Sequence, residues 1–223
     1  MIDLSQRALE AELLDAEVSD PVAAIALGDL RLVNRWLGNR GRLLAVVRPF
    51  LESRPGARLL DVGCASADIL DFLRRSATPS PLAVGLDIKL LHLRDAPRQV
   101  RCVVGNVSHL PFPPVAFDVV TVSLFLHHFA SEEIPPLLRS LYALAKQALI
   151  VNDLERARVP YAFARLALPL LFRSRLSVAD GLLSIRRGFT RTELAEAFAQ
   201  AAIPVRIERS FPYRLLAVAT KSD

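Results

Sequence analysis

Residues able to do chemistry follow three successive apolar runs, at the point where each run ends. They are Asp61, Gly63, Cys64 and Ala65 after the first run, Asp87 and Ile88 after the second, and Asn106 and Val107 after the third. An ionised carboxylate accepts hydrogen bonds from two hydroxyls, and a carboxamide offers both a donor and an acceptor to a base edge. Glycine permits a turn that a side chain would obstruct. These residue types in this order predict a nucleoside-binding site. Asp87 would bind the ribose, and Ile88 and Val107 would contact the ring of the base.

A second set of residues follows the fourth and fifth apolar runs and could move a proton. His127 and His128 come after the run that ends at Ser123, and Asp153 ends the next run. A base of this kind is needed to activate a phenol, whose unperturbed pKa is about 10. The alternative is structural: a histidine packs or caps the following helix, and Asp153 caps the next one.

An alternation of strands and helices positions these residues. Strands are predicted at Arg58–Val62, Leu82–Asp87, Val100–Val104, Phe117–Ser123 and Ala148–Val151, with a helix in each interval except the third, where Pro111–Pro114 predicts a loop. This alternation favours a mostly parallel, doubly wound α/β sheet, in which ligands bind where the strands end. Two final runs, Val205–Ser210 and Leu215–Thr220, have no helix between them and predict an antiparallel closing pair. The expected fold is a Rossmann-like sheet of seven strands.

Helical additions are predicted on both sides of this core. Residues 4–17 and 22–53 have the apolar spacing of helices and would form an N-terminal cap over 1–54, with Trp36 in its core. Residues 55–223 would form the main domain, which includes a helical insert at 155–187 after the fifth strand. Thr190 and Glu193 have the spacing of a capping box at the start of the last helix.

The motifs together resemble those of the class I S-adenosylmethionine-dependent methyltransferases. Asp61–Ala67 is similar to the glycine loop of that family, Val84–Ile88 to its ribose motif, and Gly105–Phe112 to the segment that borders adenine. Phe117–Ser123 is similar to the fourth-strand motif. The resemblance implies S-adenosylmethionine as the cofactor and implies no metal. The residues expected to hold the cofactor are Asp61, Gly63, Cys64 through its backbone, Ala65, Asp87, Ile88, Asn106, Val107 and Ser123.

Two departures from the family pattern lie in the loop, where Ala65 and Ala67 replace glycine. Their methyl groups would narrow the site or push the loop outward, which leaves a non-catalytic scaffold as one alternative. A dinucleotide-dependent oxidoreductase is disfavoured, since its motif needs glycine at Ala65 and at Asp68. The carboxylate of Asp68 would also repel a pyrophosphate at the helix start.

The composition of the helical insert at 155–187 indicates what kind of molecule accepts the methyl group. Tyr161–Phe172 is nearly all apolar and suits a small lipophilic substrate. O-methylation of a phenolic or polyketide-type hydroxyl is the first expectation. Val33–Gly38, Asn152–Arg156 and Asp180–Arg186 further resemble segments of bacterial methyltransferases found beside polyketide synthases. C-methylation of a quinone or polyketide precursor is the alternative.

Charge and composition limit the partners. The net charge is +5, and residues 155–191 hold eight arginines against two acidic residues. This basic and apolar segment predicts either peripheral membrane contact through 155–187 or a solvated helix face. Nucleic acid is not an expected partner, because no aromatic and basic platform accompanies the arginines. With two cysteines, no long apolar run and no signal peptide, the expected location is the cytoplasm, as a monomer or homodimer.

Overall fold

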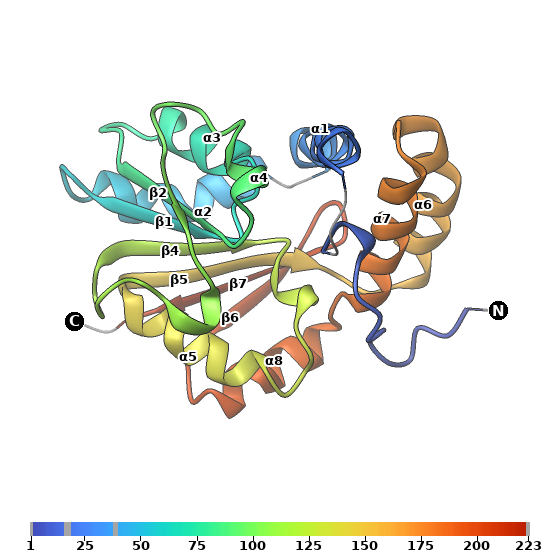
Figure 1. Ribbon diagram of the computed structural model, residues 1–223. Helices are drawn as coiled ribbons and strands as arrows, with labels where there is room; N and C mark the ends of the chain where they lie inside the picture. Colours follow the sequence, from blue (N-terminus) through green and yellow to red (C-terminus); the bar gives the residue numbers. More distant parts are fainter. Residues whose placement is uncertain (1, 16–18, 38–39, 222–223) are drawn as a thin grey trace.

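The computed structural model describes residues 2–15, 19–37 and 40–221. At its centre is a seven-stranded sheet with the order β3-β2-β1-β4-β5-β7-β6 (Figure 1). The strands are β1 (Arg58–Val62), β2 (Leu82–Asp87), β3 (Arg101–Val104), β4 (Phe117–Ser123), β5 (Ala145–Leu154), β6 (Arg206–Ser210) and β7 (Arg214–Thr220). The first five strands pair in parallel, and β7 runs antiparallel to both β5 and β6. The predicted fold class and the closing strand pair are therefore confirmed.

Helices cover both faces of the sheet. On one face lie α2 (Arg40–Glu52) and α3 (Asp68–Ser76), and on the other lie α5 (Ile134–Leu144) and α8 (Arg191–Gln200) (Figure 1). Each face has its own apolar core, because the strand residues alternate between the two faces. Thr190 and Glu193 form the predicted capping box of α8, so the local sequence sets where this helix begins.

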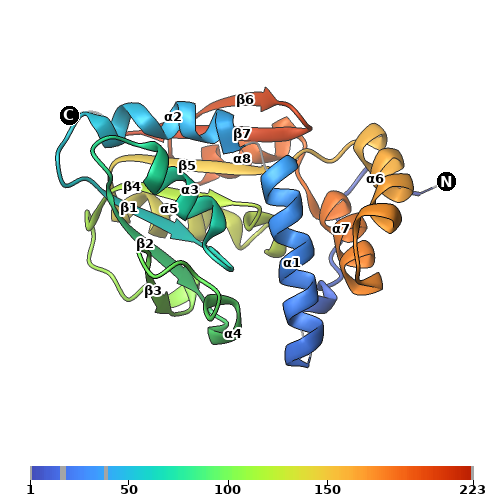
Figure 2. The ribbon, with the colours of Figure 1, turned by 90° about the horizontal axis from the view of Figure 1, so that it is seen from above.

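A third group of elements lies beyond one end of the sheet (Figure 2). It contains a 3-10 turn (Leu13–Asp15), α1 (Asp20–Trp36), α6 (Arg158–Leu171) and α7 (Arg175–Arg187). The Asp29 carboxylate of α1 accepts hydrogen bonds from the Arg173 and Ser174 amides at the start of α7. These bonds satisfy amides that a helix start leaves without partners, and they fasten the insert to the N-terminal helix. Among the described residues, no helix is both long and apolar enough to cross a bilayer.

The N-terminal helix predictions are partly wrong. In place of a helix over 4–17, the described residues up to Asp15 form only the short turn, because their backbone groups bond to the insert instead. The Ala8 amide donates to the Arg186 carbonyl, and the Leu13 and Leu14 amides donate to the Asp180 carboxylate. Residues 16 and 17 lie outside the described residues.

The predicted helix over 22–53 is two helices, α1 and α2, and residues 38–39 between them lie outside the described residues. Trp36 is not a core residue, since its side chain is 70% exposed. The inward stripe of α1 runs through Ala26, Val33 and Leu37, and Trp36 lies one position off this stripe.

Candidate active site

The strand registers bring the predicted site residues to one edge of the sheet. Val62 of β1 pairs with Leu86 and with Val122, and Ser123 pairs with Asn152. The carboxyl ends of five strands therefore meet, as the sequence predicts. A cavity of about 710 Å³ opens along this edge. Its wall includes Gly63, Ala65, Asp87, Ile88, Asn106, Val107, His127 and His128, while Asp61, Cys64, Ser123 and Asp153 lie behind it.

The loop after β1 has a conformation that glycine favours. Gly63 has φ +69°, and a Cβ atom there would lie 2.3 Å from Cδ2 of Phe125. The Gly63 and Cys64 amides both donate to the Leu86 carbonyl, which ties the loop to β2. Ala65 and Ala67 have φ values of +46° and +55°, the left-handed region, so both alanines keep a glycine-like backbone.

Asp87 is organised as an acceptor. Its carboxylate accepts hydrogen bonds from the Ala65 and Lys89 amides, each at 2.9 Å. Nδ1 of His92, in α4 (Leu90–Leu93), lies 3.2 Å from the same group. Burial raises the pKa of Asp87, but the bonds from His92 and Lys89 outweigh it and hold that pKa below its usual value. Asp87 is therefore ionised and lines the cavity, and His92 is a partner that the sequence analysis missed.

Four other predicted residues make contacts behind the cavity wall or within their own loop. Asp61 accepts from Oγ1 of Thr121 at 2.7 Å, and burial raises its pKa to about 7. Burial also raises the pKa of the Cys64 thiol, which packs in the core and is unsuited to nucleophilic attack. Oγ of Ser123 is buried without a hydrogen-bond partner among the described residues. Oδ1 of Asn106 accepts from the Ser108 amide, so its NH₂ group is what remains for a ligand.

Asp61→Asn is expected to change how stability depends on pH. The folded protein keeps this proton up to about pH 7, whereas the unfolded chain releases it near pH 4. The free energy of unfolding of the wild type should therefore fall, relative to that of the variant, by about 3 kcal/mol between pH 4.5 and 8. Urea unfolding of both proteins at several pH values measures this, and a constant difference would show that Asp61 is ionised in the fold.

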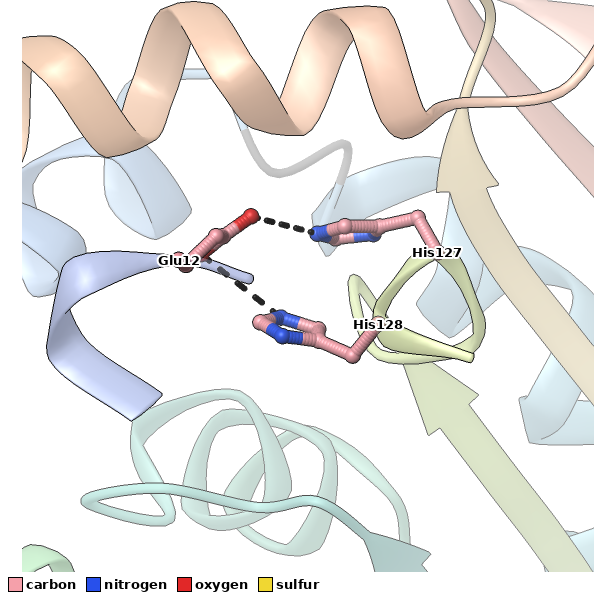
Figure 3. A group of neighbouring side chains, drawn as sticks. All are labelled: Glu12, His127 and His128. Atoms are coloured by element: carbon pink, nitrogen blue, oxygen red, sulfur yellow. Dashed lines mark ion pairs between the residues drawn. The ribbon is translucent and has the colours of Figure 1, made fainter. Parts of the chain in front are cut away.

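Glu12, His127 and His128, which line the cavity, form a cluster of side chains with the buried Asp153; Figure 3 shows the first three. Oδ1 of Asp153 is 2.7 Å from Nδ1 of His127, and Nε2 of that ring is 3.5 Å from Oε1 of Glu12. The other Glu12 oxygen is 3.8 Å from Nε2 of His128. Glu12 comes from the N-terminal segment and the histidines from the turn after β4, so the cluster joins segments far apart in sequence.

Contacts within the protein shift the pKa values of three groups in this cluster. Burial lowers the pKa of His127, but the two carboxylates outweigh it and raise that pKa to about 9. Conversely, the histidines hold the pKa values of Asp153 and Glu12 below their usual values, against the effect of burial. The ionised Asp153 can only accept, so Nδ1–H of His127 donates to it. Asp153 is not a helix cap, since the cap residue of α6 is Ala157.

The ligand atoms of Glu12, His127 and His128 lie within 4.8 Å of one another, a donor set that zinc also uses. In this arrangement, however, the carboxylate lies between the two rings and pairs with both. The Glu12 carboxylate therefore already has partners within the protein, and the absence of a metal remains a prediction.

Two arginines hold this cluster in place: Arg187, which belongs to the predicted basic segment 155–191, and Arg7, which lies outside it. Nε of Arg187 donates to the His127 carbonyl at 2.9 Å, and its Nη2 donates to the His128 carbonyl at 2.5 Å. The same guanidinium donates to the Glu10 carbonyl, and Arg7 donates to the His127 carbonyl from the other side. Nothing in the local sequence marks these roles, because each bond joins segments that are far apart in the sequence.

The far wall of the cavity is apolar. It is built by α1, α6, α7 and the turn between β6 and β7, with side chains such as Leu30, Val33, Phe163, Leu168, Phe172 and Tyr213. Polar residues of α7, namely Ser177, Asp180 and Ser184, also line the cavity, and Oγ of Ser177 is buried without a hydrogen-bond partner among the described residues. The cavity can thus hold a polar nucleoside at one end and a lipophilic molecule that carries a hydroxyl at the other.

Comparison with known proteins identifies similar chains. A family model described as "Methyltransferase domain" matches residues 59–148. A demethylmenaquinone methyltransferase of Symbiobacterium thermophilum is 28% identical over 136 residues, which is 57% of this chain. The match spans about half, 53%, of that curated relative's length.

Solved structures share the fold at low sequence identity. A SAM dependent methyltransferase from Aquifex aeolicus superposes with a TM-score of 0.66 at 15% identity, covering 92% of this chain and 99% of that one. The plantazolicin methyltransferase BpumL, in complex with a substrate analogue and SAH, gives a TM-score of 0.70 at 14% identity, covering 88% and 90%.

Proposed function

We propose that this chain, which belongs to the class I S-adenosylmethionine-dependent methyltransferases, transfers a methyl group from that cofactor to a hydroxyl of a small lipophilic acceptor. The acceptor would carry a phenolic or polyketide-type hydroxyl. One observation carries the proposal: a single cavity has the loop and carboxylate of a nucleoside site at one end, apolar helices at the other, and imidazoles between them.

The residues at the near end fit S-adenosylmethionine. The ionised Asp87 would accept from the ribose, Ile88 and Val107 would border the adenine, and the Asn106 NH₂ group would meet its edge. The loop at Gly63 would border the methionine part. The cofactor supplies an electrophilic methyl group, and the protein's part is to align donor and acceptor and to exclude water.

Replacing the loop alanines with glycine should have little effect. Ala65 and Ala67 already have the backbone conformation that glycine would adopt, so Ala65→Gly and Ala67→Gly are expected to change the cofactor dissociation constant by less than about threefold. The strain relieved by glycine, about 1 kcal/mol, is offset by the greater entropy of the unfolded chain. Isothermal titration calorimetry checks this, and a tenfold gain in affinity would mean that the methyl groups do obstruct the cofactor.

Proton removal is assigned to His128 with support from its neighbours. His128 lines the cavity, and its side chain is more exposed than that of His127, which is clamped between two carboxylates. Oε2 of Glu12, which lies 3.8 Å from Nε2 of His128, would help to orient this ring in the cavity. Asp153 does not reach the cavity and is a positioning residue, because it orients the His127 ring.

A substrate series tests the proposal. Methyl transfer from labelled S-adenosylmethionine should be measured for phenols with alkyl chains of graded length. The apolar far wall predicts that kcat/KM rises with chain length until the cavity is filled, and that the product is a methyl ether. Absence of transfer to every phenol and hydroquinone in the series would overturn the proposal.

C-methylation is the second candidate. The relative from Symbiobacterium thermophilum is named demethylmenaquinone methyltransferase, which favours a quinone-type acceptor. NMR of the product distinguishes the two reactions, since a methyl group on ring carbon and a methoxy group have separate proton shifts.

A further inference from the structure

Helix α6 has two apolar faces. The inward face carries Ala164 and Leu168, which are buried against Ile185 of α7. The outward face carries Val159, Phe163, Leu166 and Leu170, whose spacing of four, three and four residues puts them on one stripe. Val159 and Phe163 are each 61% exposed, and Leu166 and Leu170 are 74% and 86% exposed. Four neighbouring large apolar side chains exposed to water form a patch of the kind that marks an interaction site for a membrane or another protein.

Exposed arginines occur on α6 and in the residues that follow it. Arg158, Arg165, Arg173 and Arg175 are all exposed, and no acidic residue occurs between positions 157 and 179. The buried Asp180 does not offset them at the surface, because its carboxylate faces the Leu13 and Leu14 amides. An apolar stripe flanked by arginines matches an anionic lipid surface in both respects.

The stripe is continuous with the mouth of the cavity. Val159 and Phe163 belong both to the exposed stripe and to the cavity wall. Phe211 of the turn between β6 and β7 lines the same cavity and is itself largely exposed. Figure 2 shows α6 on the outer side of the group that covers the sheet edge, where no other described helix or strand lies outside it and only the N-terminal segment extends past it in this view.

We propose that the outward face of α6 docks on an anionic phospholipid bilayer, from which the cavity takes its acceptor. Bilayer docking stands on the surface alone, and the delivery of an acceptor rests on the function proposed above. A second copy of the chain is a poorer occupant, because a two-fold contact would bring two sets of arginines together without acidic partners.

Vesicle sedimentation tests the docking. Large vesicles of phosphatidylcholine, with or without an equal share of phosphatidylglycerol, are spun down with the wild-type chain in the absence of cofactor. Binding to the phosphatidylglycerol vesicles should be at least tenfold tighter than to phosphatidylcholine alone. It should fall at least tenfold in Leu166→Gln/Leu170→Gln, and the preference for phosphatidylglycerol should be lost in Arg165→Gln/Arg173→Gln.

Matched controls lie elsewhere on the surface. Leu9→Gln removes a leucine that is 79% exposed, and Arg206→Gln removes an exposed arginine of β6, so both should bind vesicles as the wild type does. All variants should keep the wild-type melting temperature and methylate a short, water-soluble phenol at the wild-type rate. Equal vesicle binding by the double leucine variant would overturn the proposal. So would light scattering that shows a wild-type dimer and a monomeric double leucine variant, because the face would then belong to a second copy.

Discussion

Gly63→Ala is expected to weaken cofactor binding by roughly 100-fold or more. The new Cβ atom would lie 2.3 Å from the Phe125 ring, a separation that requires the loop or the ring to move. Alanine at φ +69° also costs about 1–2 kcal/mol in backbone energy. Because the Ala65 amide of the same loop is bonded to Asp87, a displaced loop would disturb the ribose site as well. Calorimetric titration with S-adenosylhomocysteine measures the loss.

Two further variants separate this effect from general instability. Gly41→Ala in α2 adds a methyl group where no atom lies within 4 Å, and it should leave the affinity unchanged. Phe125→Ala in the Gly63→Ala background removes the clash and should recover part of the affinity. A folded Gly63→Ala variant with wild-type affinity would show that the loop does not border the cofactor.

His128→Gln is expected to lower kcat by about 10²–10⁴-fold, the usual contribution of a positioned base, while the cofactor dissociation constant stays within twofold. Asp153→Asn should also lower kcat, but by less, because Asp153 acts on His128 only through the His127 ring and the Glu12 carboxylate. Steady-state kinetics and calorimetry on the same preparations give both quantities.

His109→Gln is the matched control, since this histidine is exposed and is not part of the cavity wall. Full turnover in both His128→Gln and Asp153→Asn would mean that the protein acts by alignment alone. A loss of cofactor affinity equal to the loss in kcat would assign His128 to binding instead.

The sheet and the cofactor half of the site could be predicted because their signals are local. β1, β2 and β4 begin and end where the apolar runs do, and loop residues directly follow them. Parallel pairing then brings Gly63, Asp87 and Asn106 to the same edge without any knowledge of long-range contacts.

The proton-transfer half could not be predicted in the same way. Glu12 reaches His127 across more than a hundred residues, and Arg187 bonds to carbonyls, which every residue type presents equally. The amphipathic pattern of the first residues indicated a helix, but their amides are used by Asp180 and the Arg186 carbonyl. Such docking depends on tertiary contacts that override local propensity.

The central claim is that the cavity edge formed by Gly63, Ala65 and Asp87 holds S-adenosylmethionine. Calorimetric titration of the wild-type chain with S-adenosylmethionine and with S-adenosylhomocysteine tests it most directly. The structure predicts one site per chain for each compound, with micromolar dissociation constants. No binding of either compound at millimolar concentration would contradict the account.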